Sequence, residues 1–337
     1  MDVKKILIRG PNWVGDAVLA IPAMKALRSH FPNAQITLLV RPWVAGLFSS
    51  ASFINGVWTE HRPAGLGDWS RIVRSIRERQ FDLAVLFPNS FESALMMFLG
   101  RVPNRLGYAT DGRRMLLTDA IPPNRTVRHQ VEYYLDLVRE IDATVERPSI
   151  EISATLEERR EARQLLARQG IDDGERFVVL NPGAAYGSAK RWGLERFAEV
   201  GSRLDKEFGL RVAIVGSAPE LPAAQQIQTL MTAKVAILSG KTSLETLVGV
   251  IAESSLMITN DSGPMHIAAA LGVPTVAVFG STDERVTGPF APTARIVKHQ
   301  VECSPCLLRE CPIDHRCMTR VAVDDVYREA RELLKHA

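Results

Sequence analysis

The sequence has no apolar run of about 18 residues, the length that a membrane-spanning helix requires. It also lacks a cleavable secretory signal. The chain enters a strand-like apolar segment at Lys4–Arg9, and the next apolar stretch, residues 16–26, is amphipathic and interrupted by Pro22. We therefore expect a cytoplasmic protein whose only contact with a membrane would be at its surface.

Three common nucleotide-binding motifs are also missing. The loop Gly10–Asp16 contains two glycines, but no Lys-Ser or Lys-Thr follows Gly15, so it is not the phosphate loop of nucleoside triphosphatases. The sequence has no G-x-G-x-x-G, which argues against a dinucleotide-binding dehydrogenase. It has no Asp-x-Asp either, so the usual carboxylate pair for a nucleotide-bound Mg²⁺ is absent.

Cysteine is scarce and confined to one segment. The four cysteines are Cys303, Cys306, Cys311 and Cys317. Such a cluster in a cytoplasmic protein predicts either a structural metal clip, most simply zinc, or a redox-labile loop, rather than a disulfide framework. Only one Cys-x-x-Cys pair is present, and the remaining spacing is irregular for a zinc ribbon. Either kind of site would fasten a loop and would take no part in chemistry.

The net charge of +3 hides an asymmetry between the two halves of the chain. Residues 1–150 carry 19 Lys+Arg against 14 Asp+Glu, and the remainder carries 22 against 24. Sixteen of the 19 basic residues are arginine, which makes forked contacts with phosphate and carboxylate groups. An anionic partner for the first half is one interpretation, and an ordinary solvated surface is the other.

Apolar runs of strand length alternate with helical patterns, which predicts an α/β fold built from doubly wound parallel sheets. At 337 residues the chain is long enough for two domains. We place them at residues 1–153 and 154–320, followed by a helical segment at 321–337 that is free to pack back on the first domain. Strands are expected at residues 5–9, 35–40, 56–59, 81–87, 177–181, 211–215, 235–238, 256–259 and from 275 onward. Helices are expected at residues 16–30, 44–50, 69–79, 90–99, 127–143, 156–169, 194–208, 243–252, 264–272 and 323–334. Residues 101–125 are expected to be rich in turns.

The stretch Ser254–Gly280 has the pattern of a strand, a tight turn, a helix and a second strand. The turn places Asp261, Ser262 and Gly263 at the start of a helix, where free amides and the helix dipole favour an anion. Ser262 can cap these amides, so the turn either binds phosphate or simply begins a helix. His266, one turn further on, is likewise either a ligand contact or a packed core residue.

Small or polar residues end several other predicted strands, and these ends share one edge of a parallel sheet. In the second half they include Gly183, Ser217 and Thr242, with Lys190 close by. Glycines allow backbone amides to approach a ligand, so together these turns predict a site for a nucleotide diphosphate. In the first half, the strand ends carry Asn12, Trp13, Asp16, Asn89 and Ser90, and Arg105 lies in the turn-rich region that follows. We assign this set, apart from Asp16, to an acceptor molecule.

Four segments resemble one known family. They are Arg9–Asp16 (RGPNWVGD), Pro88–Leu95 (PNSFESAL), Asn181–Trp192 (NPGAAYGSAKRW) and Thr259–His266 (TNDSGPMH). In this order they resemble the ADP-heptose:lipopolysaccharide heptosyltransferases of glycosyltransferase family nine, most closely the heptosyltransferase II branch. The resemblance implies a GT-B fold, in which two Rossmann-like domains face each other across a cleft.

The resemblance also implies a reaction. It is the inverting, metal-independent transfer of L-glycero-D-manno-heptose from ADP-heptose to the first heptose of the lipid A–Kdo inner core. Transfer to another core position stays open. No cofactor is required, no nucleic acid is involved, and the enzyme would associate peripherally with the cytoplasmic face of the inner membrane.

Individual positions match the family's functional residues. Asp16 resembles the catalytic base, and Lys190 the lysine that contacts the donor phosphates. Glu220 matches an acidic ribose contact, and Thr242 lies near the adenine. Asp261, Ser262, Gly263 and His266 match the donor-site turn. Related members place two threonines where this chain has Ala185 and Tyr186, so backbone amides would replace their hydroxyl contacts.

Two other functions suit a pair of α/β domains. An NAD-dependent dehydrogenase would need the missing dinucleotide motif and an acidic residue closing the second strand. A non-catalytic, two-lobed sugar-binding protein would have no use for a carboxylate such as Asp16 at the site edge. A nicotinamide titration and a turnover assay separate these alternatives from glycosyl transfer.

Overall fold

The computed structural model describes residues 3–124 and 126–335, and in it the chain forms two units, Met1–Ser149 and Ile150–Ala337. Each unit holds a six-stranded sheet whose strand pairs are all parallel. Within the described ranges, no helix is both long and apolar enough to cross a bilayer.

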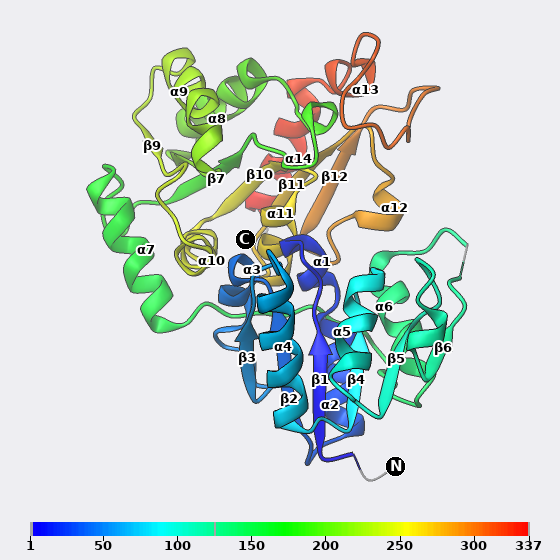
Figure 1. Cartoon of the computed structure of the whole chain (residues 1–337). Helices are drawn as coiled ribbons and strands as arrows, with labels where there is room; N and C mark the ends of the chain where they lie inside the picture. The colour runs from blue at the N-terminus through cyan, green and yellow to red at the C-terminus, as the bar shows by residue number, and fades with distance from the viewer. Residues whose placement is uncertain (1–2, 125, 336–337) are drawn as a thin grey trace. The chain divides into compact units, whose positions relative to one another are not determined.

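The first sheet has the strand order β3-β2-β1-β4-β5-β6. Its strands are β1 (Lys5–Arg9), β2 (Gln35–Val40), β3 (Gly56–Thr59), β4 (Leu83–Leu86), β5 (Asn104–Tyr108) and β6 (Asp119–Ile121). Its helices are α1 (Val14–Leu19), α2 (Ile21–His30), α3 (Pro42–Ala45), α4 (Leu66–Arg79), α5 (Phe91–Leu99) and α6 (Gln130–Arg139), with 3₁₀ turns at Gly46–Phe48 and Arg114–Leu116. Helices α4 and α5 pack together on one face, and α1, α2 and α6 form the other layer (Figure 1).

The second sheet has the order β12-β11-β10-β7-β8-β9, which is the same topology as the first. Its strands are β7 (Phe177–Asn181), β8 (Arg211–Ile214), β9 (Val235–Ile237), β10 (Leu256–Asn260), β11 (Thr275–Phe279) and β12 (Ala294–Lys298). Its helices are α7 (Leu156–Arg168), α8 (Leu194–Phe208), α9 (Leu221–Leu230), α10 (Leu244–Glu253), α11 (Gly263–Ala270), α12 (Glu284–Thr287), α13 (Arg316–Thr319) and α14 (Val323–Lys335), with 3₁₀ turns at Ser188–Lys190 and Ala218–Glu220.

The central strands are apolar along their whole length because helices cover both faces of each sheet. All residues of β4, β7, β10 and β11 are buried. Helix α14 adds Val326, Ala330 and Leu334 to the core of the second unit. The separate segment expected at residues 321–337 is therefore corrected, because this helix packs within the second unit.

The sequence missed three strands, β5, β6 and β12. Both β5 and β6 lie in the stretch expected to be rich in turns, whose last residue, Arg125, lies outside the described residues. Strand β5 (NRLGY) begins with two polar residues and β6 is three residues long, so neither shows a clear apolar pattern. The single helix expected to end near residue 30 is divided at Ala20, and α9 was not expected.

The strand order fixes where ligands can bind. In both sheets the strand order reverses between the two central strands, which are β1 and β4 in the first and β7 and β10 in the second. Open α/β sheets bind ligands outside the carboxyl ends of the strands at such a switch point. The segments that follow these four strands contain Asp16, Asn89, Lys190 and Asp261.

Candidate active site

The loops after β7 and β10 are joined by buried side-chain amides. Asn181 Nδ2 donates to Thr259 Oγ1 at 2.8 Å and to Ser262 Oγ at 2.7 Å. Asn260 Nδ2 donates to the Pro182 carbonyl at 2.7 Å. The Ser262 hydroxyl does not cap α11, which corrects the expected cap and leaves the first amides of that helix without a side-chain cap.

Lys190 and Asp261 meet at this edge as an ion pair. Lys190 Nζ lies 2.6 Å from Asp261 Oδ2, and the Thr282 hydroxyl donates to the same oxygen at 2.6 Å. The two side chains are only 13% and 5% exposed, so the pair is poorly screened by water. The ammonium also lies 4.9 Å from the centre of the Tyr186 ring. The sequence predicted both residues for the donor site, and the structure brings them together.

A second group surrounds the Glu220 carboxylate, which accepts hydrogen bonds from the Ser217 amide at 2.7 Å and its hydroxyl at 2.8 Å. A Cβ at position 183 would lie 1.9 Å from Glu220 Oε1, so Gly183 makes room for this carboxylate. Gly183, Ser217 and Glu220 thus form one cluster. The close approach of Gly183 to a ligand stays a prediction, and the space needed by Glu220 is a second reason for glycine at this position.

Ser239, which the sequence did not single out, is buried beside this cluster. Its hydroxyl has no hydrogen-bond partner among the described residues, and it lies near Gly216 at the end of β8. Thr242 is half-buried just before α10, after the edge strand β9. Gly263 begins α11, and His266 is buried in its first turn.

In the first unit, Asp16 lies in the first turn of α1 and accepts a hydrogen bond from the Tyr134 hydroxyl of α6. The Tyr134 side chain is buried, and this burial, together with the adjacent Asp16 carboxylate, raises the pKa of Tyr134 well above its usual range. The phenol therefore stays neutral and remains a donor. Gln130 donates in turn to the Tyr134 oxygen.

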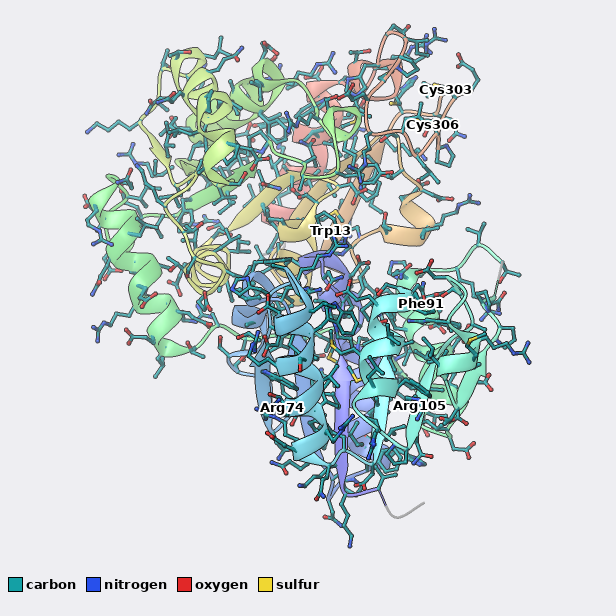
Figure 2. All side chains as sticks on the ribbon, in the orientation of Figure 1. Trp13, Arg74, Phe91, Arg105, Cys303 and Cys306 are labelled. Carbon is teal, nitrogen blue, oxygen red and sulfur yellow. The ribbon has the colours of Figure 1, made fainter. Side chains whose placement is uncertain are left out.

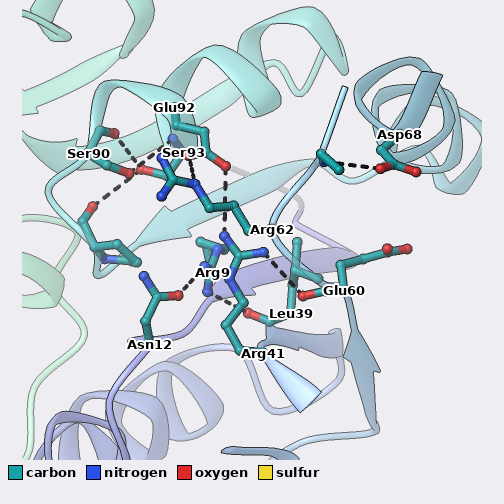
Figure 3. Close-up of polar contacts among 12 residues, drawn as sticks. Arg9, Asn12, Leu39, Arg41, Glu60, Arg62, Asp68, Ser90, Glu92 and Ser93 are labelled. Atoms are coloured by element: carbon teal, nitrogen blue, oxygen red, sulfur yellow. Dashed lines mark hydrogen bonds and ion pairs between the residues drawn. The ribbon is translucent and has the colours of Figure 1, made fainter. Parts of the chain in front are cut away.

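The loop that carries Asp16 is anchored through Asn12 (Figure 3). Asn12 Oδ1 accepts from the Arg9 guanidinium, and the Asn12 carbonyl accepts from Trp43 Nε1 at 2.9 Å. Trp13 is 62% exposed at the same loop, so its indole is available to a ligand. Asn12 therefore also stabilises this loop, a structural role that was not predicted from the sequence.

Arginines that the sequence missed surround Asn12. Arg9 and Arg41 are both buried, and Arg41 lies 3.7 Å from Glu92, which is also 3.8 Å from the exposed Arg62 (Figure 3). Burial, followed by the charge of Arg41, lowers the pKa of Arg9 to about 10. Their positions could have been predicted from the sequence, because Arg9 ends β1 and Arg41 directly follows β2.

The loop after β4 is organised by another arginine, Arg113. Its fully buried guanidinium donates to the Pro88 carbonyl and, at 3.3 Å, to Asn89 Oδ1. Asn89 Nδ2 donates to the Tyr133 hydroxyl at 2.7 Å. Ser90 caps α5 by accepting from the Ser93 amide. Asn89 and Ser90 lie after the carboxyl end of β4, as expected, and their side chains form hydrogen bonds within the first unit.

The assignment of Arg105 to the acceptor site is wrong. Arg105 is the second residue of β5 and lies toward the amino ends of the strands, whereas Trp13 marks the carboxyl edge (Figure 2). Its guanidinium donates to the carbonyls of Val102, Pro103 and Leu116. These bonds make it a structural residue of the β5 region, whereas Arg9, Arg41 and Arg113 lie at or just after the carboxyl ends of their strands.

The four cysteines are free thiols: Cys303, Cys306 and Cys311 lie between β12 and α13, and Cys317 lies in α13. Burial and the neighbouring thiols of Cys303, Cys306 and Cys311 raise the pKa of Cys317. Among the described residues, no three His, Cys, Asp or Glu side chains are arranged to hold a metal ion. The structure gives the predicted zinc clip no support.

The sequence profile described as glycosyltransferase family 9 (heptosyltransferase) matches residues 69–316. The chain belongs to glycosyltransferase family 9. The lipopolysaccharide heptosyltransferase 2 of Salmonella typhimurium is 32% identical over 306 residues, which are 87% of this chain and 88% of that protein. The lipooligosaccharide heptosyltransferase 2 of Haemophilus influenzae is 31% identical over the same shares.

Solved structures of this glycosyltransferase family agree with the topology. The E. coli ADP-heptose LPS heptosyltransferase II matches with a TM-score of 0.86 and 27% identity, covering 98% of this chain and 99% of that one. A family 9 glycosyltransferase from Veillonella parvula matches with a TM-score of 0.88 at 22% identity, which shows the fold alone. The family and the GT-B fold expected from the sequence motifs are thereby confirmed.

Proposed function

We propose that this family 9 glycosyltransferase transfers L-glycero-D-manno-heptose from ADP-heptose to the first heptose of the lipid A–Kdo inner core of lipopolysaccharide. The relatives named heptosyltransferase 2 support this choice of substrates. The observation that carries the proposal is the Lys190–Asp261 pair at the switch point of the second sheet, beside the uncapped start of α11.

The second unit supplies the groups that a departing diphosphate needs. Negative charge builds on ADP as its bond to the sugar breaks, and fixed positive groups that meet this charge lower the barrier. In the proposal the Lys190 ammonium and the Gly263 amide at the start of α11 receive the phosphates. Asp261 and Thr282 hold the ammonium in place before the donor arrives. These groups take the place of a Mg²⁺ ion, and the reaction is metal-independent.

The Glu220 cluster suits the ribose of the donor. A carboxylate can accept hydrogen bonds from two hydroxyl groups. Glu220 lies in the 3₁₀ turn after β8, the strand next to the central strand β7. Gly183 keeps the space that this carboxylate occupies. Thr242, beyond the next strand, and His266, in α11, complete the proposed donor site, with Thr242 on the adenine side.

The first unit supplies the base. The acceptor hydroxyl attacks the anomeric carbon, its proton passes to Asp16, and the carbon–oxygen bond to ADP breaks with the electron pair leaving on the phosphate. Attack from the side opposite ADP inverts the anomeric centre. General base catalysis by such a carboxylate is worth roughly 10²–10⁴-fold. Trp13, Asn12, Asn89 and Ser90 frame the acceptor, and Arg41 and Arg62 offer positive charge to its anionic groups.

The acceptor is a lipid, so we propose peripheral association with the cytoplasmic face of the inner membrane. The excess positive charge of residues 1–150 favours an anionic lipid surface.

The decisive experiment supplies purified protein with ADP-heptose and defined truncated cores, and identifies the product by mass spectrometry. We expect one heptose to be added to the core that ends in a single heptose, with equal rates in EDTA and in Mg²⁺. Transfer only to a core without heptose would show that the enzyme adds the first heptose of the core and not the second. Loss of activity in EDTA that Mg²⁺ restores would contradict metal independence.

A further inference from the structure

The segment Cys303–His315, which lies between β12 and α13, bonds to residues next to both sides of the Lys190–Asp261 pair. We call it the cysteine loop. On the Asp261 side, Ser304 Oγ donates to the Gly280 carbonyl at 2.6 Å, and the Leu307 amide donates to the Ser281 carbonyl at 2.8 Å. The next residue, Thr282, is the one that bonds Asp261.

On the Lys190 side, the cysteine loop pairs with both backbone groups of Ala189. The Ala189 amide donates to the Arg309 carbonyl at 3.0 Å, and His315 Nε2 lies 2.9 Å from the Ala189 carbonyl. A carbonyl only accepts, so Nε2 of His315 is the protonated ring nitrogen. Ala189 is 1% exposed and directly precedes Lys190 in a single 3₁₀ turn.

The fit is close enough to require a glycine. A Cβ at Gly187 would lie 2.1 Å from the Arg309 carbonyl oxygen, so the turn that carries Lys190 can reach the cysteine loop only with glycine at this position. The Tyr186 hydroxyl adds a bond to the Leu307 carbonyl at 2.8 Å. The cysteine loop therefore holds this turn through the Tyr186 side chain and both backbone groups of Ala189.

We infer that the cysteine loop positions Lys190 for the donor diphosphate, and that His315 is the positioning residue that acts through the Ala189 carbonyl. This inference rests on the proposed function and deepens it. When the diphosphate binds, the Lys190 ammonium exchanges part of its contact with Asp261 for phosphate oxygens. A fixed backbone then limits where the ammonium can go, and His315 fixes that backbone without touching the substrate.

The test compares two substitutions of similar size. His315 has a backbone φ of 57°, and Gln and Leu bear the same cost there because both carry a Cβ. Only Gln retains a donor that reaches the Ala189 carbonyl. We expect His315→Leu to lower kcat/KM for ADP-heptose about tenfold and to leave the KM for the acceptor unchanged. His315→Gln should keep most of the wild-type kcat/KM. His299→Leu, at an exposed histidine outside the loop, is the matched control.

Direct binding of ADP, measured by calorimetry, separates this inference from the proposed function. Weaker ADP binding by His315→Leu than by His315→Gln would support the positioning role even if the wild type transferred no heptose. Equal donor kinetics and equal ADP affinity in the two variants would overturn it. The inference would also be overturned if both variants had a lower Tm and if kcat/KM fell equally for ADP-heptose and for the acceptor.

Discussion

The two units share one strand order, yet the acidic residues at their switch points have different partners. Asp16 follows β1 and is bound by a neutral phenol, that of Tyr134. Asp261 follows β10 and is bound by the Lys190 ammonium and the Thr282 hydroxyl. The Tyr134 phenol is an uncharged donor to Asp16, whereas the Lys190 ammonium pairs Asp261 with the opposite charge. Under the proposed function, the same topology offers a base in one unit and a fixed cation in the other.

The proposed function gives proton transfer to Asp16, and loss of this carboxylate should have the largest effect. We expect Asp16→Asn to lower kcat by roughly 10²–10⁴-fold while the affinity for ADP-heptose changes by no more than a few fold. The amide keeps the size of the side chain but accepts no proton. Single-turnover rates and donor calorimetry measure the two quantities.

The control for this variant is Asp142→Asn, at an exposed position where the backbone φ is 60°, which Asn tolerates well. Near-normal turnover of Asp16→Asn would show that another group accepts the proton, and the proposed functional difference between the two carboxylates would be lost.

Removal of the cation should be the next largest effect. We expect Lys190→Met to reduce kcat/KM for ADP-heptose by about 10²-fold, the usual loss when one group that stabilises a transition-state charge is removed. It should also lower Tm, because Asp261 is left buried beside a single hydroxyl donor.

The double variant Lys190→Met/Asp261→Asn distinguishes the two consequences. Its Tm should return toward that of the wild type, since no unpaired charge stays buried, while its donor kcat/KM stays low. Recovery of kcat/KM in the double variant would show that the lysine serves only to neutralise Asp261.

A smaller effect should follow when the neutral donor to Asp16 is removed. We expect Tyr134→Phe to lower kcat about tenfold and to move the acid limb of the kcat–pH profile to higher pH, because a carboxylate without its hydrogen-bond donor is protonated more easily. Tyr108→Phe is the matched control, since Tyr108 is also buried and its hydroxyl donates to the Tyr133 carbonyl. It should change Tm without moving the pH profile, and an unmoved profile in Tyr134→Phe would separate this tyrosine from the base.

The comparison also shows what the sequence alone can and cannot predict. Continuous apolar runs identified the central strands, and polar residues at their ends identified Asp16, Lys190 and Asp261, because both signals are local. The ion pair itself, the Tyr134 donor and the buried Arg113 join segments up to 118 residues apart, such as Asp16 and Tyr134. No local pattern reveals such partners. The short strands β5 and β6 were missed for the related reason that pairing, rather than composition, creates them.

Arg105 illustrates the same limit and gives the prediction with the smallest effect on the acceptor. Its charge suggested an anion contact, but its position in β5 places it at the amino ends of the strands, where it binds three carbonyls. We expect Arg105→Ala to lower Tm and to leave the acceptor KM within twofold.

Arg62→Ala should instead raise the acceptor KM about threefold with little change in Tm. Arg62 is exposed and its contact with Glu92 spans 3.8 Å, and exposed ion pairs contribute little to stability. Steady-state kinetics at two salt concentrations measure both variants, since screening should weaken the Arg62 contribution. If Arg105→Ala raised the acceptor KM more than Arg62→Ala did, acceptor binding would lie at the opposite edge of the first sheet, and the proposed pairing of acceptor and base at one edge would fail.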